Sequence, residues 1–279
     1  MLACIMMSVT SCAFGDVASG SDRAIYDGFD YRTQALDGSD GGKGAWKTEW
    51  RKSAAGGVAL LAPGFEYKDG DGWQLAVHGR RAQLSSNVTA GAYRDFDASS
   101  AGLIPGGEEG GGKGVLWMSF LAQIEGGPFE NSGDEISFQL RAAKDLPLLT
   151  VGVMGRLNEW RIRAEGITKV FSRGAAKRPP EMLSWIVIRV DVDNAPGVSD
   201  AVHLWVNPRA PREPSVSLAN ARIVGQDLWG AEHPFQPVRL RIGTIGTAKS
   251  GPEKHLAWDE IRLGRSFADV APAARTPGD

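Results

Sequence analysis

Alternation of apolar and polar side chains along short segments is the feature that most limits how this chain can fold. In segment 135–142 (EISFQLRA), every second residue from Ile136 onward is apolar, and three of the residues between them are polar or charged. Segments 115–124, 184–192 and 201–207 show a similar pattern. Successive residues of a strand face opposite sides of a sheet, so the pattern predicts strands with one core face and one mixed face.

Such segments recur from about residue 25 to residue 270, separated by clusters of Gly, Pro, Asn and Asp. No stretch shows a convincing 3.6-residue period, so we expect an all-β chain, a two-sheet antiparallel β-sandwich forming a single domain over residues 24–270. Residues 271–279 are expected to form a disordered tail. The expected strands are Ala24–Tyr31, Val58–Ala62, Trp73–His78, Ala92–Phe96, Val115–Ile124, Glu135–Arg141, Leu148–Val153, Glu159–Ala164, Ser184–Val192, Ala201–Asn207, Val238–Thr244 and His255–Leu263.

The composition excludes several classes of partner. Lys and Arg number 31 against 33 Asp and Glu, which argues against a nucleic-acid partner. No apolar run reaches the roughly 20 residues that a transmembrane helix needs. The 36 glycines fit the many turns of a β-sandwich.

The amino-terminal segment predicts export. Residues 1–15 are apolar and end in small residues, as in a secretory signal, although the usual positive charge is missing. We therefore expect residues 1–20 to be a signal peptide or a lipoprotein signal. Residues 9–12 (VTSC) are similar to a bacterial lipobox, in which Cys12 would be lipidated; a cleaved signal and a disordered apolar tail are the alternatives.

Motifs for nucleotide or metal binding are incomplete. Gly107–Lys113 has the spacing of a phosphate-binding loop, but Gly114 replaces the Ser or Thr, and a strand rather than a helix follows. The acidic clusters 69–72 and 191–194 do not complete a calcium loop and are better explained as turns. Zinc is not indicated, because both cysteines precede the domain and the histidines lack ligand spacing.

Motifs for hydrolysis are absent as well. The E-x-D-x-x-E motif that aims three acids into one groove of sandwich glucanases is missing. Asp134 and Glu135 are adjacent, as are Asp259 and Glu260, so each pair is expected to point to opposite faces. No G-x-S-x-G elbow is present. An enzyme is therefore not the favoured interpretation.

Four segments in order carry a resemblance to a known superfamily: YDGFDY at 26–31, LWMSFL at 116–121, LWVNP at 204–208 and WDEIRLG at 258–264. Together the chain resembles the concanavalin A-like lectin/glucanase superfamily, in particular the LamG-like jelly-roll domains of secreted bacterial proteins. The resemblance implies two packed antiparallel sheets with a concave and a convex surface. It requires no cofactor, but it implies a place for one structural calcium near Asp30 and Asp259.

Alternation also predicts a binding face on the side of the strands that is turned away from the core. Aromatic rings stack on sugars, and Arg, Gln and Asn donate directional hydrogen bonds. The alternative is that the loops 97–114 or 208–235 cover this face and make it a second core. The expected ligand-binding residues are Trp117, Gln139, Arg141, Trp185, Arg189, His203, Trp205 and Asn207.

These observations favour an exported, non-catalytic β-sandwich that binds carbohydrate or another component of the cell envelope. It would be secreted, periplasmic or anchored through a lipid. One alternative is a structural or adhesion domain at the cell surface without a small-molecule site. Another is a glycoside hydrolase or lyase whose active site has no recognisable motif.

Overall fold

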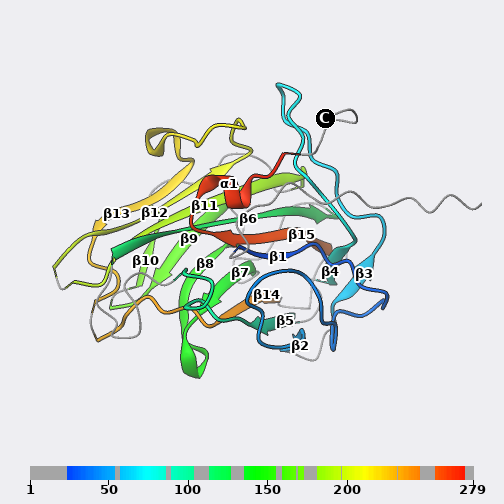
Figure 1. Cartoon of the computed structure of the whole chain (residues 1–279), viewed down its shortest axis with the longest axis horizontal. Helices are drawn as coiled ribbons and strands as arrows, with labels where there is room; N and C mark the ends of the chain where they lie inside the picture. Colours follow the sequence, from blue (N-terminus) through cyan, green and yellow to red (C-terminus); the bar gives the residue numbers. More distant parts are fainter. Residues whose placement is uncertain are drawn as a thin grey trace, which may run out of the picture.

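Two antiparallel β-sheets packed face to face form the body of the protein (Figure 1). The computed structural model describes residues 24–53, 57–85, 89–103, 113–126, 135–154, 159–167, 169–172, 181–195, 197–230, 232–245 and 255–273. The architecture confirms the expected all-β, jelly-roll-type sandwich. No helix in these residues is long and apolar enough to cross a membrane.

Within the described residues the first sheet has eight strands, of which β6 and β15 lie in the middle of Figure 1. Its strands follow the order β13-β12-β11-β6-β15-β4-β3, and β1 also pairs with β15. The bounds are β1 Ile25–Asp27, β3 Ala59–Leu61, β4 Arg81–Ser85, β6 Lys113–Glu125, β11 Ser184–Asp193, β12 Asp200–Val206, β13 Ala221–Gln226 and β15 His255–Gly264.

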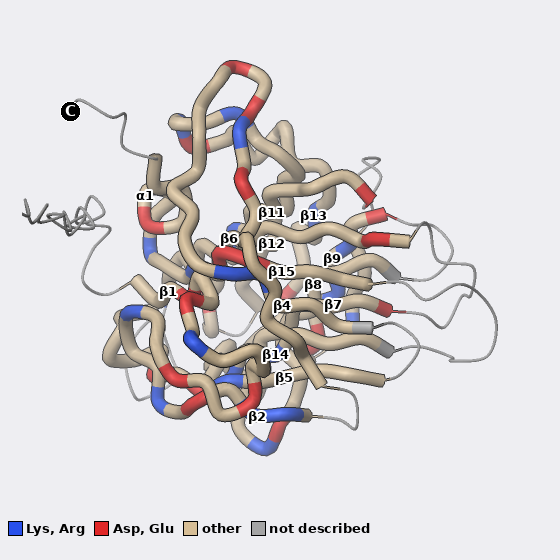
Figure 2. Tube along the Cα trace, turned by 90° about the vertical axis from the view of Figure 1, so that its right-hand side faces the viewer, with Lys and Arg blue, Asp and Glu red and all other residues tan. Residues whose placement is uncertain are grey.

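The second sheet has seven strands in the order β10-β9-β8-β7-β14-β5-β2. Figure 2, which turns the molecule by 90°, shows β7, β8, β14 and β5 of this sheet side by side. The bounds are β2 Arg51–Lys52, β5 Ala90–Asp95, β7 Glu135–Arg141, β8 Pro147–Met154, β9 Trp160–Glu165, β10 Lys169–Phe171 and β14 Arg239–Ile245.

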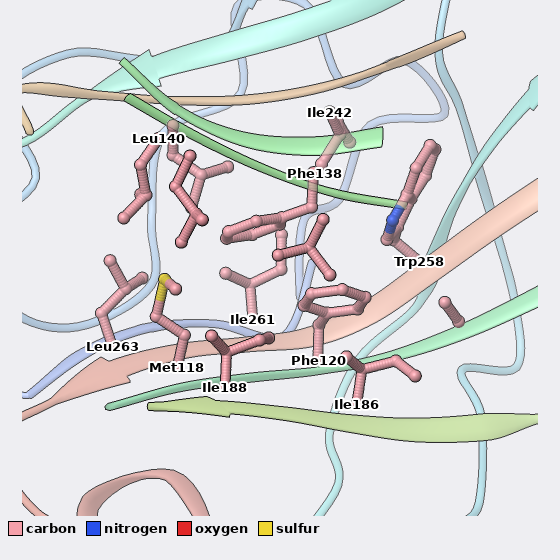
Figure 3. Close-up of a cluster of buried hydrophobic side chains, with 14 of the residues drawn as sticks. Met118, Phe120, Phe138, Leu140, Ile186, Ile188, Ile242, Trp258, Ile261 and Leu263 are labelled. Atoms are coloured by element: carbon pink, nitrogen blue, oxygen red, sulfur yellow. The ribbon is translucent and has the colours of Figure 1, made fainter. Parts of the chain in front are cut away.

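The main core lies between the sheets and is built by the inward residues of the alternating strands (Figure 3). Phe120 of β6 stacks on Phe138 of β7, with ring centroids 4.8 Å apart, so the contact joins the two sheets. The chain crosses from one sheet to the other between β6 and β7.

A second apolar cluster lies on the outer face of the eight-stranded sheet. The short helix α1 (Phe267–Val270) packs on β15 and β6, and the segment 65–77 covers the neighbouring surface. The hydroxyl of Ser119 donates to the carbonyl of Val270 at 2.6 Å, which ties the end of the helix to β6. This outer face is therefore a second core.

Two expected elements differ from the structure. The segment Trp73–His78 is not a strand; Leu75 and Trp73 instead pack into the second cluster. The first residues of the expected tail, 271–273, are held by backbone contacts, because Ala273 bridges to Leu75 and Pro272 accepts from Ala76. Residues 274–279 lie outside the described residues.

Candidate functional site: the outer face of the seven-stranded sheet

The three tryptophans expected to bind a ligand lie on the eight-stranded sheet and are covered. Trp117, Trp185 and Trp205 are 2%, 0% and 2% exposed. Trp117 stacks on Trp205 at 5.8 Å and meets Phe267 of α1 at 5.5 Å. The expectation of an open aromatic surface here is wrong, because α1 and the segment 65–77 seal it. The alternative that the loop 208–235 covers this face is confirmed in part, because the carbonyl of Ser215 in that loop accepts a hydrogen bond from the indole N–H of Trp205.

The polar members of the same face have partners within the protein. Arg189 pairs with Asp191 at 2.7 Å and with Glu213 at 3.0 Å. The side-chain oxygen of Asn207 accepts from the backbone N–H of Trp185 at 2.7 Å. His203 is buried and stacks on Trp205.

Gln139 and Arg141 lie on β7, in the other sheet, so the expected eight residues do not share one surface. The error has a simple cause. Alternation shows which side of a strand a residue faces, but it does not show which sheet the strand joins. Since β6 and β7 belong to opposite sheets, their outward residues lie on opposite sides of the sandwich.

Strand register places Gln139 in a row of side chains that crosses the seven-stranded sheet on its outer face. We call this surface the arginine face, since the row and its neighbours contain Arg141, Arg161, Arg163, Arg239 and Arg241. The residues of the row, each opposite the next, are Arg51, Tyr93, Arg241, Gln139, Thr150, Arg163 and Phe171.

Arg241 is the distinctive member of this row. Its side chain is half-buried, and none of the described residues is a hydrogen-bond partner of its Nε. Among the described residues no carboxylate forms an ion pair with it; burial, followed by the charge of Arg141, lowers the pKa of its guanidinium, although the charges of Asp145 and Glu135 act in the opposite direction. A half-buried cation without an ion-pair partner is costly, and an anionic ligand would offset that cost.

The other arginines of the face form ion pairs with Asp or Glu side chains. Arg163 donates to Glu135 at 2.9 Å and to Glu165 at 2.6 Å. Arg239 donates to Asp95 at 2.6 Å, and its guanidinium lies 4.1 Å from the ring centre of Tyr93. These pairs hold the surroundings of Arg241 in place.

Gln139 is held in the row by its neighbours. It is 5% exposed, its amide donates to Ser137 at 3.1 Å, and its oxygen accepts from Arg141. Arg141 also donates to Asp145 at 2.7 Å. Although burial opposes ionisation of Asp145, Arg141 and Arg239 together lower the pKa of this carboxyl below its usual value.

The next row on the same face has almost no side chains. Gly91, Gly243, Ser137 and Gly152 lie opposite one another on β5, β14, β7 and β8. A Cβ on Gly243 would lie 3.6 Å from the Nε of Arg241, so this guanidinium leans over the glycine. The residues of this row are buried, and the side chains of Ser53 and Arg241 lie over two of its glycines, Gly91 and Gly243.

The residues Asp30 and Asp259 do not fit a calcium site. Asp259 is buried, and its two oxygens accept from the N–H groups of Phe65 at 2.7 Å and Glu260 at 2.8 Å. Asp30 is exposed. Within the described part of the chain, no three His, Cys, Asp or Glu gather to hold a metal.

The expectation that Asp259 and Glu260 face opposite sides is also wrong. A bulge in β15 between Asp259 and Arg262 places Glu260 at a φ of 57°. Both acids consequently accept from the chain that covers this face, Asp259 from the N–H of Phe65 at the start of the segment 65–77 and Glu260 from the N–H of His78 directly after it. Burial raises the pKa of both carboxyls. They are sealed, so they form no cleft for hydrolysis.

Several expected sites lie outside the described residues: Cys12 with the whole segment 1–20, residues 107–112 of the phosphate-loop-like motif, and Asp134. Lys113 and Gly114 begin strand β6, so the strand expected from Val115 starts two residues earlier.

Of the arginines that build the face, only Arg141 was predicted from the sequence, although a signal for the others was present. Segments 239–245 (RLRIGTI) and 160–165 (WRIRAE) alternate Arg with buried apolar residues. Two arginines spaced two apart on a strand share a face. Their neighbours across the sheet could not be identified, because register depends on pairings between distant segments.

Comparisons with known proteins support the fold. No family model matches the chain, and no curated protein matches its sequence. The endo-beta-1,4-glucuronan lyase from the fungus Trichoderma reesei has a similar structure, with a TM-score of 0.52 and 11% identity over 81% of this chain and 94% of that one.

Two further structures are more distant. A family 7 alginate lyase has a TM-score of 0.41 and 12% identity, covering 74% of this chain and 85% of that one. The botulinum neurotoxin serotype C1 binding domain has a TM-score of 0.43 and 7% identity, covering 78% of this chain and 47% of that one. At these identities the likeness concerns the fold, and the narrower LamG-like resemblance stays a prediction.

Proposed function

We propose that the protein binds an acidic polysaccharide, of the uronate class, on the arginine face. The observation that carries the proposal is Arg241, a half-buried guanidinium without a carboxylate partner among the described residues, directly opposite Gln139 in the strand register. Arg presents a planar fork of donors that matches a carboxylate. Tyr93, half-buried and opposite Arg241 in the same row, adds a phenol hydroxyl for sugar hydroxyls, whereas Gln139 and Thr150 are buried and support the row from within.

The shape of the face agrees with a linear ligand. Strands in a sheet lie about 4.8 Å apart, so the row from Tyr93 to Arg163 extends over about 19 Å. That the solved structure with the TM-score of 0.52 is a glucuronan lyase is consistent with an acidic glycan on this fold.

Binding of defined oligoglucuronates, followed by calorimetry, tests the proposal. Arg241→Gln keeps the size and polarity of the side chain and removes its charge. We expect at least about a tenfold loss of affinity, because a hydrogen bond to a charged group contributes about 1.5–3 kcal/mol. Arg32→Gln, at an exposed residue outside the face, is the matched control and should bind as the wild type does.

Neutral cello-oligosaccharides of the same length should bind much more weakly than the uronates. If Arg241→Gln and the wild type bind oligoglucuronates equally, the arginine face is not the site. If the wild type binds no acidic glycan while its fold is intact, a structural or adhesion role is favoured instead.

A lyase is the second candidate, and Tyr93 is the residue that favours it. Tyr93 lies opposite Arg241 on the adjacent strand, so a phenol and a guanidinium face the same ligand. In β-elimination of a uronate, the C5 proton passes to a base, the C4–O bond breaks, a C4–C5 double bond forms, and the leaving oxygen takes a proton. Arg241 would stabilise the charge that develops on the carboxylate, and Tyr93 would transfer a proton.

Ultraviolet absorbance of the unsaturated uronate separates the two candidates. Product formed by the wild type and not by Tyr93→Phe would assign the lyase. Binding without any product from glucuronan or alginate would assign a non-catalytic binding protein.

Export also belongs to the proposal, on the grounds of the apolar residues 1–15. Mass spectrometry of the mature protein expressed in a bacterial host tests it. A diacylglyceryl group on Cys12 would identify a lipid-anchored form, an unmodified cleaved terminus would identify a secreted or periplasmic form, and an intact Met1 would contradict export.

A further inference from the structure

A pocket of about 320 Å³ opens at one end of the arginine face. It lies where β5 ends at Asp95 and β7 ends at Arg141, and where β14 begins at Arg239. The 3₁₀ turn Ala143–Asp145 closes one side of it, and Lys47 lies on its wall. We call this the end pocket.

The lining of the end pocket combines an apolar part with positive charge. Phe96 and Val238 contribute apolar surface. Lys47 and Lys144 contribute ammonium groups, and Lys144 has no ion-pair partner among the described residues. A ring that is apolar on one side and carries an anionic group would fit both parts.

The two acids of the pocket are already engaged. The carboxylate of Asp95 accepts two bonds from Arg239, at 2.6 and 3.2 Å. Asp145 accepts from Arg141 at 2.7 Å and from Arg239 at 3.2 Å. Since these carboxylates neutralise two arginines, and Lys47 pairs with Asp97 at 3.4 Å, the charge of Lys144 is the one that no described residue neutralises and that a ligand would meet.

The turn that carries Lys144 has an unusual backbone. Lys144 has φ 59° and ψ 21°, and Asp145 has φ 60°. Two successive non-glycine residues in the left-handed region cost free energy, and such conformations gather at functional sites. Here the conformation places Asp145 between two guanidinium groups and Lys144 on the lining of the pocket.

We propose that the end pocket is a second subsite of the arginine face, which takes one sugar ring bearing an anionic group and holds that group at Lys144. The inference rests on the proposed function and extends it. Arg239 precedes Arg241 by two residues of one strand, a distance of about 7 Å, so the pocket lies about one ring away from Arg241 in the direction of the strand, at right angles to the row that crosses the sheet. The protein would therefore recognise two acidic rings of one chain.

The length dependence of binding tests this subsite. We would measure the affinity of oligoglucuronates from the monosaccharide to the tetrasaccharide for the wild type, Lys144→Gly and Lys144→Arg. Glycine removes the charge but favours the same left-handed backbone, so the turn is kept. Lys68→Ala, at an exposed residue outside the arginine face, is the control.

We expect the wild type to gain affinity when the ligand becomes long enough to reach the pocket. Lys144→Gly should bind the longer oligoglucuronates about two- to fivefold more weakly than the wild type does, which is the range for a solvent-exposed ion pair. Its affinity for the monosaccharide should be unchanged. Lys144→Arg should retain the gain. Sulfated cello-oligosaccharides in the same series show whether the group held is a carboxylate or any anion.

Two results would overturn the subsite while leaving the proposed function intact: the same length profile for Lys144→Gly and the wild type, or an equal loss at every length. A loss with neutral cello-oligosaccharides as large as that with uronates would also overturn it. Failure of the wild type to bind any oligouronate would overturn both proposals together.

Discussion

Replacing Trp185 by Ala tests whether the outer face of the eight-stranded sheet is core or binding surface. The indole is fully buried and packs on Trp73 at 5.1 Å, Tyr67 at 5.6 Å and Phe267 at 6.2 Å. If this face is core, the substitution costs stability. If it is a ligand site, the substitution costs affinity and little else.

The expected cost follows from the area and the contacts. A tryptophan side chain buries about 200 Å², which at about 25 cal/mol per Å² corresponds to about 5 kcal/mol. The alanine methyl retains part of this burial. No described residue accepts a hydrogen bond from the indole N–H of Trp185, so removal of this group offsets a further part of the cost. We therefore expect a loss of about 3–4 kcal/mol in the free energy of unfolding.

Urea denaturation and calorimetry measure this loss. For a domain of this size about 3–4 kcal/mol corresponds to a fall in Tm of about 10 °C. Leu218→Ala, at a residue that is 72% exposed, should change the free energy of unfolding by no more than about 0.5 kcal/mol. An unchanged Tm for Trp185→Ala, together with loss of glycan binding, would refute the assignment of this face as core.

Two further predictions concern a glycine and a histidine. A Cβ on Gly152 would lie 1.9 Å from the carbonyl oxygen of Ile136, so Gly152→Ala should destabilise the protein by about 3 kcal/mol in urea denaturation. Gly57→Ala, where a Cβ would meet none of the described atoms within 4 Å, should be close to neutral, and equal effects of the two substitutions would contradict the packing. Burial lowers the pKa of His203, so the stability that its neutral form contributes is lost as pH falls from about 6.5 through the folded pKa. His203→Gln should flatten the dependence of the free energy of unfolding on pH in this window, and an unchanged slope would contradict the role of His203.

The strands were largely predictable from the sequence, because alternation is a local property. The bounds expected for Glu135–Arg141 are those of β7. Segment 73–78 was misjudged, since its alternation serves packing onto the second cluster rather than strand pairing. Strands β4 and β13 were missed, since five to six residues of mixed polarity give a weak pattern.

The candidate site was predictable only in part. Gln139 and Arg141 belong to the arginine face, whereas the six other expected residues face the second cluster. Separating the two groups requires knowledge of which strands share a sheet, and of what covers each outer face. Both depend on contacts between distant segments, such as α1 with β6, and local patterns do not contain this information.

The placement of α1 matters for handling the protein in the laboratory. Phe267 packs on both Trp117 and Trp185, and residues 272 and 273 are joined to the segment 75–76. A shortened version ending at Gly264, the last residue of β15, would keep every strand and yet present a broad aromatic patch to solvent. Such a fragment should self-associate, so expression boundaries drawn from the sheets alone would produce an aggregating protein.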